Sequence, residues 1–182
     1  MKKMRLLIII LILSICLCNN NKYAKKIKNY LSNLGFTKAG IAGIMGNLYA
    51  LSKLNPNYSD KIKRIKTGLS EEEYVKLANN GQYSNKKFVK DQIGFGIAAW
   101  VRWNRKQSLL NACKGHIGDP YCQVDYLISE LKNEYKSLYQ TLTSSTDVSL
   151  CCQQFLLEYV NPTNYYAEVT DRRNDCFTFY YY

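Results

Sequence analysis

Two tryptophans beside a glycine-rich segment are the first residues of this chain that could handle a ligand. The segment runs from Gly94 to Trp100, and Trp103 follows three residues later. Glycine lets a backbone approach a ligand closely, and an indole offers a flat apolar face on which a pyranose ring can stack. We expect a short strand or tight loop here, with Trp100 and Trp103 as candidate faces for stacking a ligand ring. Packing in the core is an equal alternative for Trp100.

Metal and nucleophile chemistry finds little support in the residue types. His116 is the single histidine, it follows Gly115 in an expected loop, and the chain has no Cys-x-x-Cys pair. Zinc sites combine several such ligands, and a nucleophilic cysteine needs an adjacent base. We therefore expect no metal and no cofactor, and we interpret His116 as structural or solvated.

The start of the chain is typical of a secretory signal peptide. Met1-Lys2-Lys3-Met4-Arg5 precedes an apolar run over residues 6–13, and small residues stand before position 19. This order of a basic, an apolar and a small-residue region predicts cleavage near Cys18. The alternative is an uncleaved anchor, but about 12 apolar residues fall short of the roughly 20 that span a bilayer. We expect a signal peptide over residues 1–18, one domain over residues 19–182, and a secreted protein.

The charge after cleavage remains strongly basic. Removing Lys2, Lys3 and Arg5 leaves 22 basic residues against 14 acidic, a net charge of +8. A basic secreted protein is attracted to anionic surfaces such as bacterial walls, by forces that weaken in salt. Compositional bias is the alternative explanation. No run of Lys and Arg interleaved with aromatics predicts a nucleic-acid groove, so we expect no nucleic-acid partner.

The cysteine count supports export. Five cysteines remain after cleavage, so at most two internal bridges can form and one thiol is left over. Adjacent Cys151 and Cys152 point to different faces of a helix and need separate partners. We expect two bridges from them, with the partners among the other three cysteines, which are Cys113, Cys122 and Cys176.

Apolar periodicity and capping residues predict a helical chain. Thr37 is expected to cap a helix whose glycines, Gly40, Gly43 and Gly46, allow a neighbour to approach closely. Ser70 and Glu73 form a capping box for a helix ending near Gly81. The other helices are expected over residues 22–34, from Arg102 onward, from Asp119-Pro120 to about Leu138, near 147–159 and over 165–177, with a break at 161–163.

Two separated motifs carry a resemblance to a known family. Residues 43–56 resemble G-I-M-G-N-L-x-A-E-S-x-L-N-P, and residues 94–100 with the following R-K-x-x-L-L at 105–110 resemble a second block. Both are similar to motifs of the phage tail lysozyme domain, and the resemblance covers roughly residues 23–182. It implies a mainly α, lysozyme-like domain with a short strand or loop segment.

The motif departs from the family at the residue that would do the chemistry. Leu51 stands where the family has glutamate, Lys53 replaces a small residue, and Ala99 replaces a glutamine. Protonation of a leaving glycosidic oxygen needs a carboxylic acid, which leucine cannot replace. In structural terms Leu51 continues the apolar stripe of Ile44 and Leu48; the functional alternative is that it lines a remodelled cleft that still holds sugar.

The resemblance also implies a sugar cleft between residues 43–56 and 94–103. A weak candidate for a substitute acid is Asp91, with Asp60 and Asp125 weaker still, although hydrolysis normally needs two carboxyl groups. Asn57 begins a sequon that is a candidate for glycosylation. The residues expected to hold an N-acetylated sugar are polar or aromatic: Asn47, Tyr49, Ser52, Phe95, Trp100 and Trp103.

Three functions therefore remain open. The favoured one is a secreted pseudoenzyme that binds bacterial peptidoglycan or a related glycan with little or no hydrolysis. The first alternative is an active muramidase that uses a substitute acid such as Asp91. The second is a non-catalytic secreted module that binds another protein.

Overall fold

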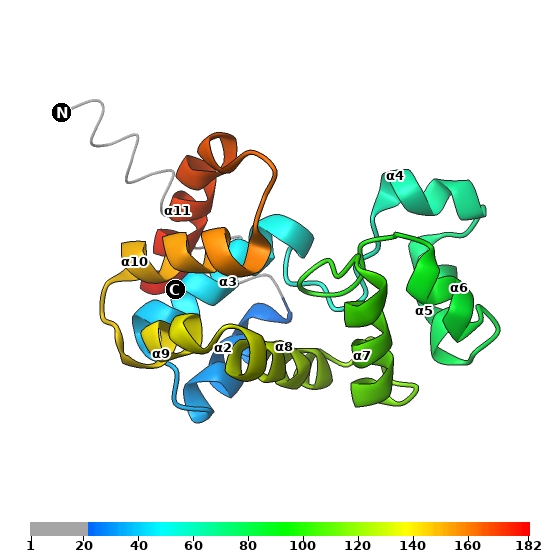
Figure 1. The fold of residues 1–182 in the computed structure, drawn as a ribbon, viewed down its shortest axis with the longest axis horizontal. Helices are drawn as coiled ribbons and strands as arrows, with labels where there is room; N and C mark the ends of the chain where they lie inside the picture. Colours follow the sequence, from blue (N-terminus) through cyan, green and yellow to red (C-terminus); the bar gives the residue numbers. More distant parts are fainter. Residues whose placement is uncertain (1–21) are drawn as a thin grey trace. The chain divides into compact units, whose positions relative to one another are not determined.

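The computed structural model describes residues 22–182, and all regular secondary structure in this range is helical (Figure 1). The mainly α fold class is thereby confirmed. The predicted signal peptide, with Cys16 and Cys18, lies outside the described residues. None of the described helices is both long and apolar enough to cross a membrane.

The chain divides into two compact units, and the division falls inside the predicted domain. The terminal unit contains residues 22–50 and 131–182, and the central unit contains residues 51–130. Helices α3 (Lys38–Ser52) and α8 (Pro120–Glu134) each contain one of the boundaries.

The terminal unit is built on close contacts along α3. A Cβ added at Gly40 would overlap the carbonyl oxygen of Leu142, and one at Gly46 would lie 2.6 Å from Cys176 Sγ. The predicted role of these glycines is confirmed, as is the Thr37 cap, whose Oγ1 accepts from the Gly40 amide at 2.9 Å. The other helices of this unit are α2 (Ala24–Asn33), α9 (Lys136–Ser144), α10 (Val148–Gln154), the π-helix η2 (Phe155–Val160) and α11 (Tyr165–Tyr181).

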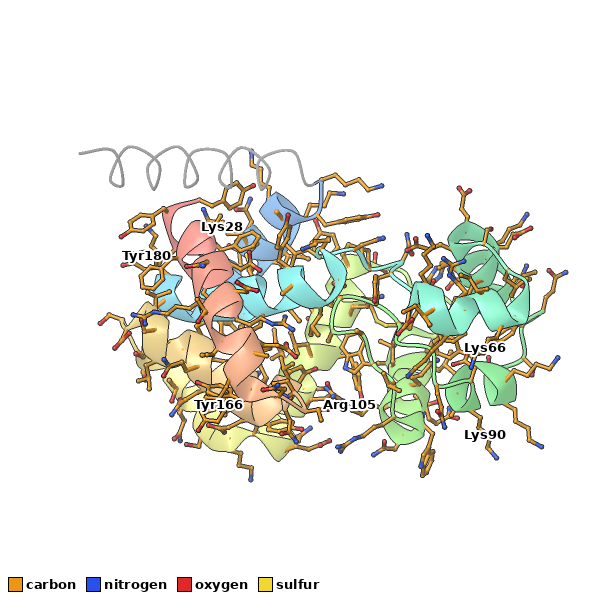
Figure 2. The ribbon with its side chains drawn as sticks, turned by 90° about the horizontal axis from the view of Figure 1, so that it is seen from above. Lys28, Lys66, Lys90, Arg105, Tyr166 and Tyr180 are labelled. Atoms are coloured by element: carbon orange, nitrogen blue, oxygen red, sulfur yellow. A yellow bond between two sulfur atoms is a disulfide. The ribbon has the colours of Figure 1, made fainter. Side chains whose placement is uncertain are left out.

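Two tyrosines at the C-terminal end of the chain, one in the last turn of α11 and one just after it, contact lysines of other helices. The Lys38 ammonium lies 4.6 Å from the ring centre of Tyr180, and the Lys28 ammonium lies 4.8 Å from that of Tyr182. Figure 2 labels Lys28 and Tyr180 among the side chains of this unit. These cation–π contacts tie the C-terminal end of the chain to its own unit.

The central unit carries the candidate site. Its helix α5 (Glu71–Asn79) begins at the predicted capping box of Ser70 and Glu73, which is confirmed. Two short helices were not predicted, because they hold too few residues to show periodicity: α4 (Lys61–Arg64), continued by the 3-10 turn η1 (Ile65–Thr67), and α6 (Asn85–Lys90). Helix α7 (Trp103–Cys113) begins after Arg102, as expected.

One helix is shorter than the sequence predicts and one is longer. The prediction that α8 reaches Leu138 is wrong, because Tyr135 leaves the helical region with φ −127° and ψ 51°. Leu138 is nevertheless buried on α9, so the apolar stripe continues across a break that periodicity does not detect. Helix α11 continues past the predicted end at Phe177 to Tyr181.

Two disulfides are present in the described residues, one in each unit. Cys152 pairs with Cys176, and Cys113 pairs with Cys122. The leftover thiol is confirmed and is the buried Cys151. The expected bridge from Cys151 is wrong, because Cys151 packs against Gly43 of α3 and forms no disulfide. The short loop between α7 and α8 instead brings Cys113 to Cys122.

Candidate functional site

The glycine-rich segment folds into a tight loop inside the central unit. The backbones of Phe95 and Trp100 exchange two hydrogen bonds, of 3.1 and 2.8 Å, and the Ala99 amide donates to Gly96 O at 3.0 Å. Both turn residues have left-handed backbones, with φ 75° at Gly96 and 48° at Ala99. The tight loop expected from the sequence is confirmed.

Two buried polar side chains hold this loop. Ser52, at the end of α3, donates its hydroxyl to Ile97 O at 2.7 Å. Gln123 of α8 accepts from the Ile97 amide at 2.8 Å and donates to Pro56 O at 2.7 Å. A Cβ at Gly96 would lie 2.7 Å from Gln123 Oε1. Glycine at this position therefore leaves room for the Gln123 side chain. The close approach predicted for a ligand is therefore occupied by the protein itself.

Trp100 is part of the core. It is 1% exposed, and its indole N–H donates to Glu130 at 3.0 Å. The same carboxylate binds the Arg105 guanidinium through two contacts of 2.6 and 2.8 Å and accepts from the Tyr126 hydroxyl at 2.8 Å. Burial, and then the adjacent Glu130 charge, raise the pKa of Tyr126. Of the two readings of Trp100, the geometry favours core packing.

Asp91 lies in a second cluster of buried polar groups. One of its oxygens accepts from Lys106 Nζ at 2.6 Å and from the Ile93 amide at 2.8 Å, and the other accepts from the Tyr74 hydroxyl at 2.8 Å. Lys106 is fully buried and also donates to Ile93 O at 3.0 Å. Its ammonium lies 4.1 Å from the ring centre of Phe88. This arrangement satisfies a buried charge pair in the way that low-dielectric interiors require.

Burial shifts the pKa of the lysine and of the tyrosines in this cluster. Burial lowers the pKa of Lys106, against the opposing effect of the Asp91 charge. Burial and then Asp91 raise the pKa of Tyr74, and they raise that of Tyr83 to about 12. Tyr74 thus keeps the proton that it donates to Asp91 at neutral pH.

The end of α3 places the remaining motif residues in different surroundings. Asn47 is fully buried in the terminal unit, where its amide donates to Gly43 O at 2.9 Å and Cys152 O at 3.1 Å. Tyr49 is half-buried and packs edge-on against Phe179, with ring centres 5.5 Å apart. Leu51, in the central unit, is half-buried.

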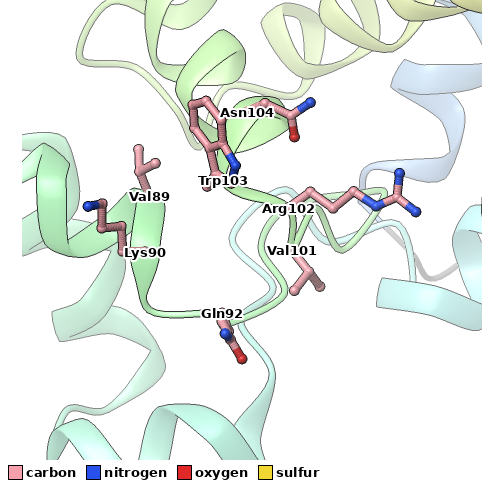
Figure 3. A pocket seen from close by; sticks show the side chains of 7 residues that line it. All are labelled: Val89, Lys90, Gln92, Val101, Arg102, Trp103 and Asn104. Carbon is pink, nitrogen blue, oxygen red and sulfur yellow. The ribbon is translucent and has the colours of Figure 1, made fainter.

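An open pocket in the central unit contains the exposed tryptophan. Its volume is about 860 Å³, and Figure 3 shows Val89 on α6 and Trp103 at the start of α7 across it from each other. Trp103 is 66% exposed. Two cations, Lys90 and Arg102, also line the pocket, together with Gln92, Val101 and Asn104.

The predicted sugar-binding residues therefore divide sharply. Trp103 is the one of the six that lies on an open surface. Phe95 is buried and packs on Phe88 with ring centres 5.3 Å apart. Ser52 contacts the glycine-rich loop, whereas Asn47 and Tyr49 belong to the terminal unit. A sugar-binding role for these residues remains a prediction.

The weaker acidic candidates and the histidine lie outside these clusters. Asp60 caps α4 by accepting from the amides of Ile62 and Lys63. Asp125 and His116 are exposed. Within residues 22–182, no three His, Cys, Asp or Glu side chains are grouped so that they could hold a metal ion.

Three residues of the site were missed by sequence reasoning. Lys106 and Gln123 occupy buried positions, and Glu130 accepts four hydrogen bonds from three side chains. One signal could have identified Lys106, because helical spacing places it on the stripe of Leu109, Leu110 and Cys113, all of which are buried. A lysine on such a stripe predicts a buried ion pair.

Comparison with known proteins gives one match. The model of the family described as phage tail lysozyme matches residues 22–182. No curated protein and no solved structure matches the chain.

Proposed function

Since the chain belongs to the phage tail lysozyme family, we propose that it is a secreted protein that binds bacterial peptidoglycan with little or no hydrolysis. The family supports peptidoglycan as the polymer on which it acts. The two disulfides support export, because such bonds persist in oxidising compartments.

The proposed loss of hydrolysis rests on the partners of the carboxylates around the candidate site. Leu51 supplies no proton where the family has an acid. Two carboxylates of the central unit, Asp91 and Glu130, are each held by a cation and by further donors. A general acid must instead carry a proton toward the leaving oxygen.

This arrangement also weighs against the muramidase alternative. Asp91 is tied to Lys106, Tyr74 and the Ile93 amide, so taking over the catalysis would require it to release these partners. Asp91→Asn keeps the shape of the side chain and removes its charge. If the native protein lyses cell walls and a folded Asp91→Asn protein does not, the alternative holds and our proposal fails.

The binding surface that we propose is the pocket at Trp103. Its exposed indole offers a stacking face for a pyranose ring. Lys90 and Arg102 line the same pocket and have the charge to meet the carboxylates of wall sugars and peptides. Lysozyme-like binding would thus persist although the proton donor is lost.

Sedimentation with insoluble peptidoglycan tests this surface. Trp103→Ala is expected to weaken retention about tenfold through the lost stacking and apolar contact. Tyr166→Ala is the matched control, because Tyr166 is an exposed aromatic of the terminal unit, and it should leave retention unchanged. If the native protein is not retained at low salt, the proposal fails. If both variants are retained equally, the pocket is not the binding surface.

A further inference from the structure

The segment after Asp60 exposes two aliphatic side chains to an unusual degree. Ile62 is 80% exposed and Ile65 is 62% exposed, more than any other large aliphatic side chain in the described chain. Their spacing of three residues places them on one face of α4 and η1. Together these two side chains form a small exposed apolar patch, which alone does not identify a partner.

The backbone holds these isoleucines outward. Asp60 accepts from the amides of Ile62 and Lys63 at 2.9 and 3.2 Å. Arg64 is buried and donates to Leu69 O at 2.7 Å, so the segment is fixed from its inner side. The exposure of Ile62 and Ile65 is thus built into the fold.

Lysines surround the two isoleucines. Lys61, Lys63 and Lys66 are exposed, and Lys66 is labelled in Figure 2. Within residues 22–182, none of these three forms an ion pair. Asp60 is the single acidic residue between positions 60 and 70, so the segment is positive and complements an anionic partner.

We propose that Ile62 and Ile65, with Lys61, Lys63 and Lys66, form a peripheral docking surface for a bilayer that contains anionic lipids. Isoleucine can enter the boundary between headgroups and acyl chains, while lysine extends its ammonium to the phosphates. An anionic glycan would attract the lysines alone, because sugars stack on aromatic faces and not on branched aliphatic ones. This surface shares no residue with the pocket at Trp103, so it does not depend on the proposed function.

Vesicle flotation of the whole protein tests the surface. The protein should bind vesicles of phosphatidylcholine mixed with phosphatidylglycerol, and it should bind vesicles of phosphatidylcholine alone far more weakly. The Ile62→Ser/Ile65→Ser variant should lower the partition coefficient about tenfold for each residue. The matched control is Leu150→Ser/Leu157→Ser, two exposed aliphatics of the terminal unit, and it should bind as the native protein does.

A charge variant separates lipid binding from general attraction. In the Lys61→Gln/Lys63→Gln/Lys66→Gln variant, the partition coefficient for anionic vesicles should fall about fivefold for each lysine removed. The control variant, Lys25→Gln/Lys26→Gln/Lys136→Gln, removes three exposed lysines of the terminal unit. Its binding to anionic vesicles should fall much less. Equal loss in both charge variants, or no binding to anionic vesicles, overturns the proposal. A native dimer that Ile62→Ser dissociates would also overturn it, because the occupant would then be a second copy.

Discussion

The terminal and central units each contain one disulfide, but they differ in how their cores are packed. In the terminal unit, the glycines of α3 bring backbones into contact and the Cys152–Cys176 bridge crosses the core. In the central unit, the core contains two carboxylates paired with Lys106 and Arg105. The carboxylates of the central unit thus have several partners within the protein, including one cation each. An acid in the right region is therefore no evidence of catalysis until its partners are known.

Breaking the buried ion pair of the central unit should reduce the stability of the protein more than any other change proposed below. Lys106→Met leaves Asp91 without its cation and should cost about 3–5 kcal/mol of the free energy of unfolding. Denaturant unfolding measures it, with the exposed Lys86→Met as control, which should stay within about 0.5 kcal/mol. Adding Asp91→Asn to Lys106→Met should recover part of the loss, because the unpaired charge is gone. If the double variant is no more stable than Lys106→Met alone, the ion pair does not stabilise this core.

The packing of the terminal unit is tested by adding one methyl group. Gly40→Ala would push a Cβ into the carbonyl oxygen of Leu142 and should cost about 3 kcal/mol, because a backbone must shift. In the central unit, Gly94→Ala meets its nearest atom at 3.2 Å, so a loss below about 1 kcal/mol is expected. Thermal melting of both variants gives the comparison. Equal losses would mean that close backbone packing does not distinguish the units.

The helices and their caps could be predicted because they depend on local sequence. Thr37, Ser70 and Asp119 each cap the helix expected after them. The break at Tyr135 could not be predicted, since the apolar stripe passes through it to the buried Leu138. The pairing of Cys113 with Cys122 depends on how helix ends meet in space, which residue spacing alone does not specify.

The candidate site was less predictable than the fold. The types of Ser52 and Asn47 suggested sugar binding, yet the structure gives both of them buried backbone partners. Polar side chains serve equally well for ligands and for satisfying buried backbone groups, and only burial separates the two uses. Trp103 could be distinguished from Trp100 only when their exposure was known.

Each unit contains one disulfide, so the two bridges can be compared directly. Chain entropy predicts a loss of about 3.5 kcal/mol for Cys152→Ala/Cys176→Ala and roughly 2.5 kcal/mol for Cys113→Ala/Cys122→Ala, because the sequence separations are 24 and 9. Denaturant unfolding of the two variants tests this order. A larger loss at the shorter loop would show that packing, and not loop length, sets the contribution.

The smallest effect concerns alkaline pH and the central unit. The pKa of Tyr83 is raised to about 12, so the folded protein keeps a proton that the unfolded chain releases above about pH 10. The contribution of Tyr83 to the free energy of unfolding is therefore fully present below about pH 10 and is lost as the pH rises toward 12. Tyr83→Phe should flatten the fall of the free energy of unfolding in that window.

The opposite shift at Lys106 does not obscure this result. Its pKa is lowered, so stability should rise with pH only up to the unfolded lysine value of about 10.4. Tyr166→Phe, at an almost fully exposed tyrosine of the terminal unit, is the control and should leave the slope unchanged. An unchanged slope in Tyr83→Phe would mean that the folded protein does not raise the pKa of this hydroxyl.

The most direct test of the proposed function is the release of soluble sugar from purified peptidoglycan by the native protein and by Leu51→Glu. We predict that the native protein sediments with the polymer and releases no reducing ends, because position 51 has no proton to give. Release by Leu51→Glu alone would show that the binding surface survives and that the acid alone was lost. Release of soluble sugar by the native protein would contradict the proposed function.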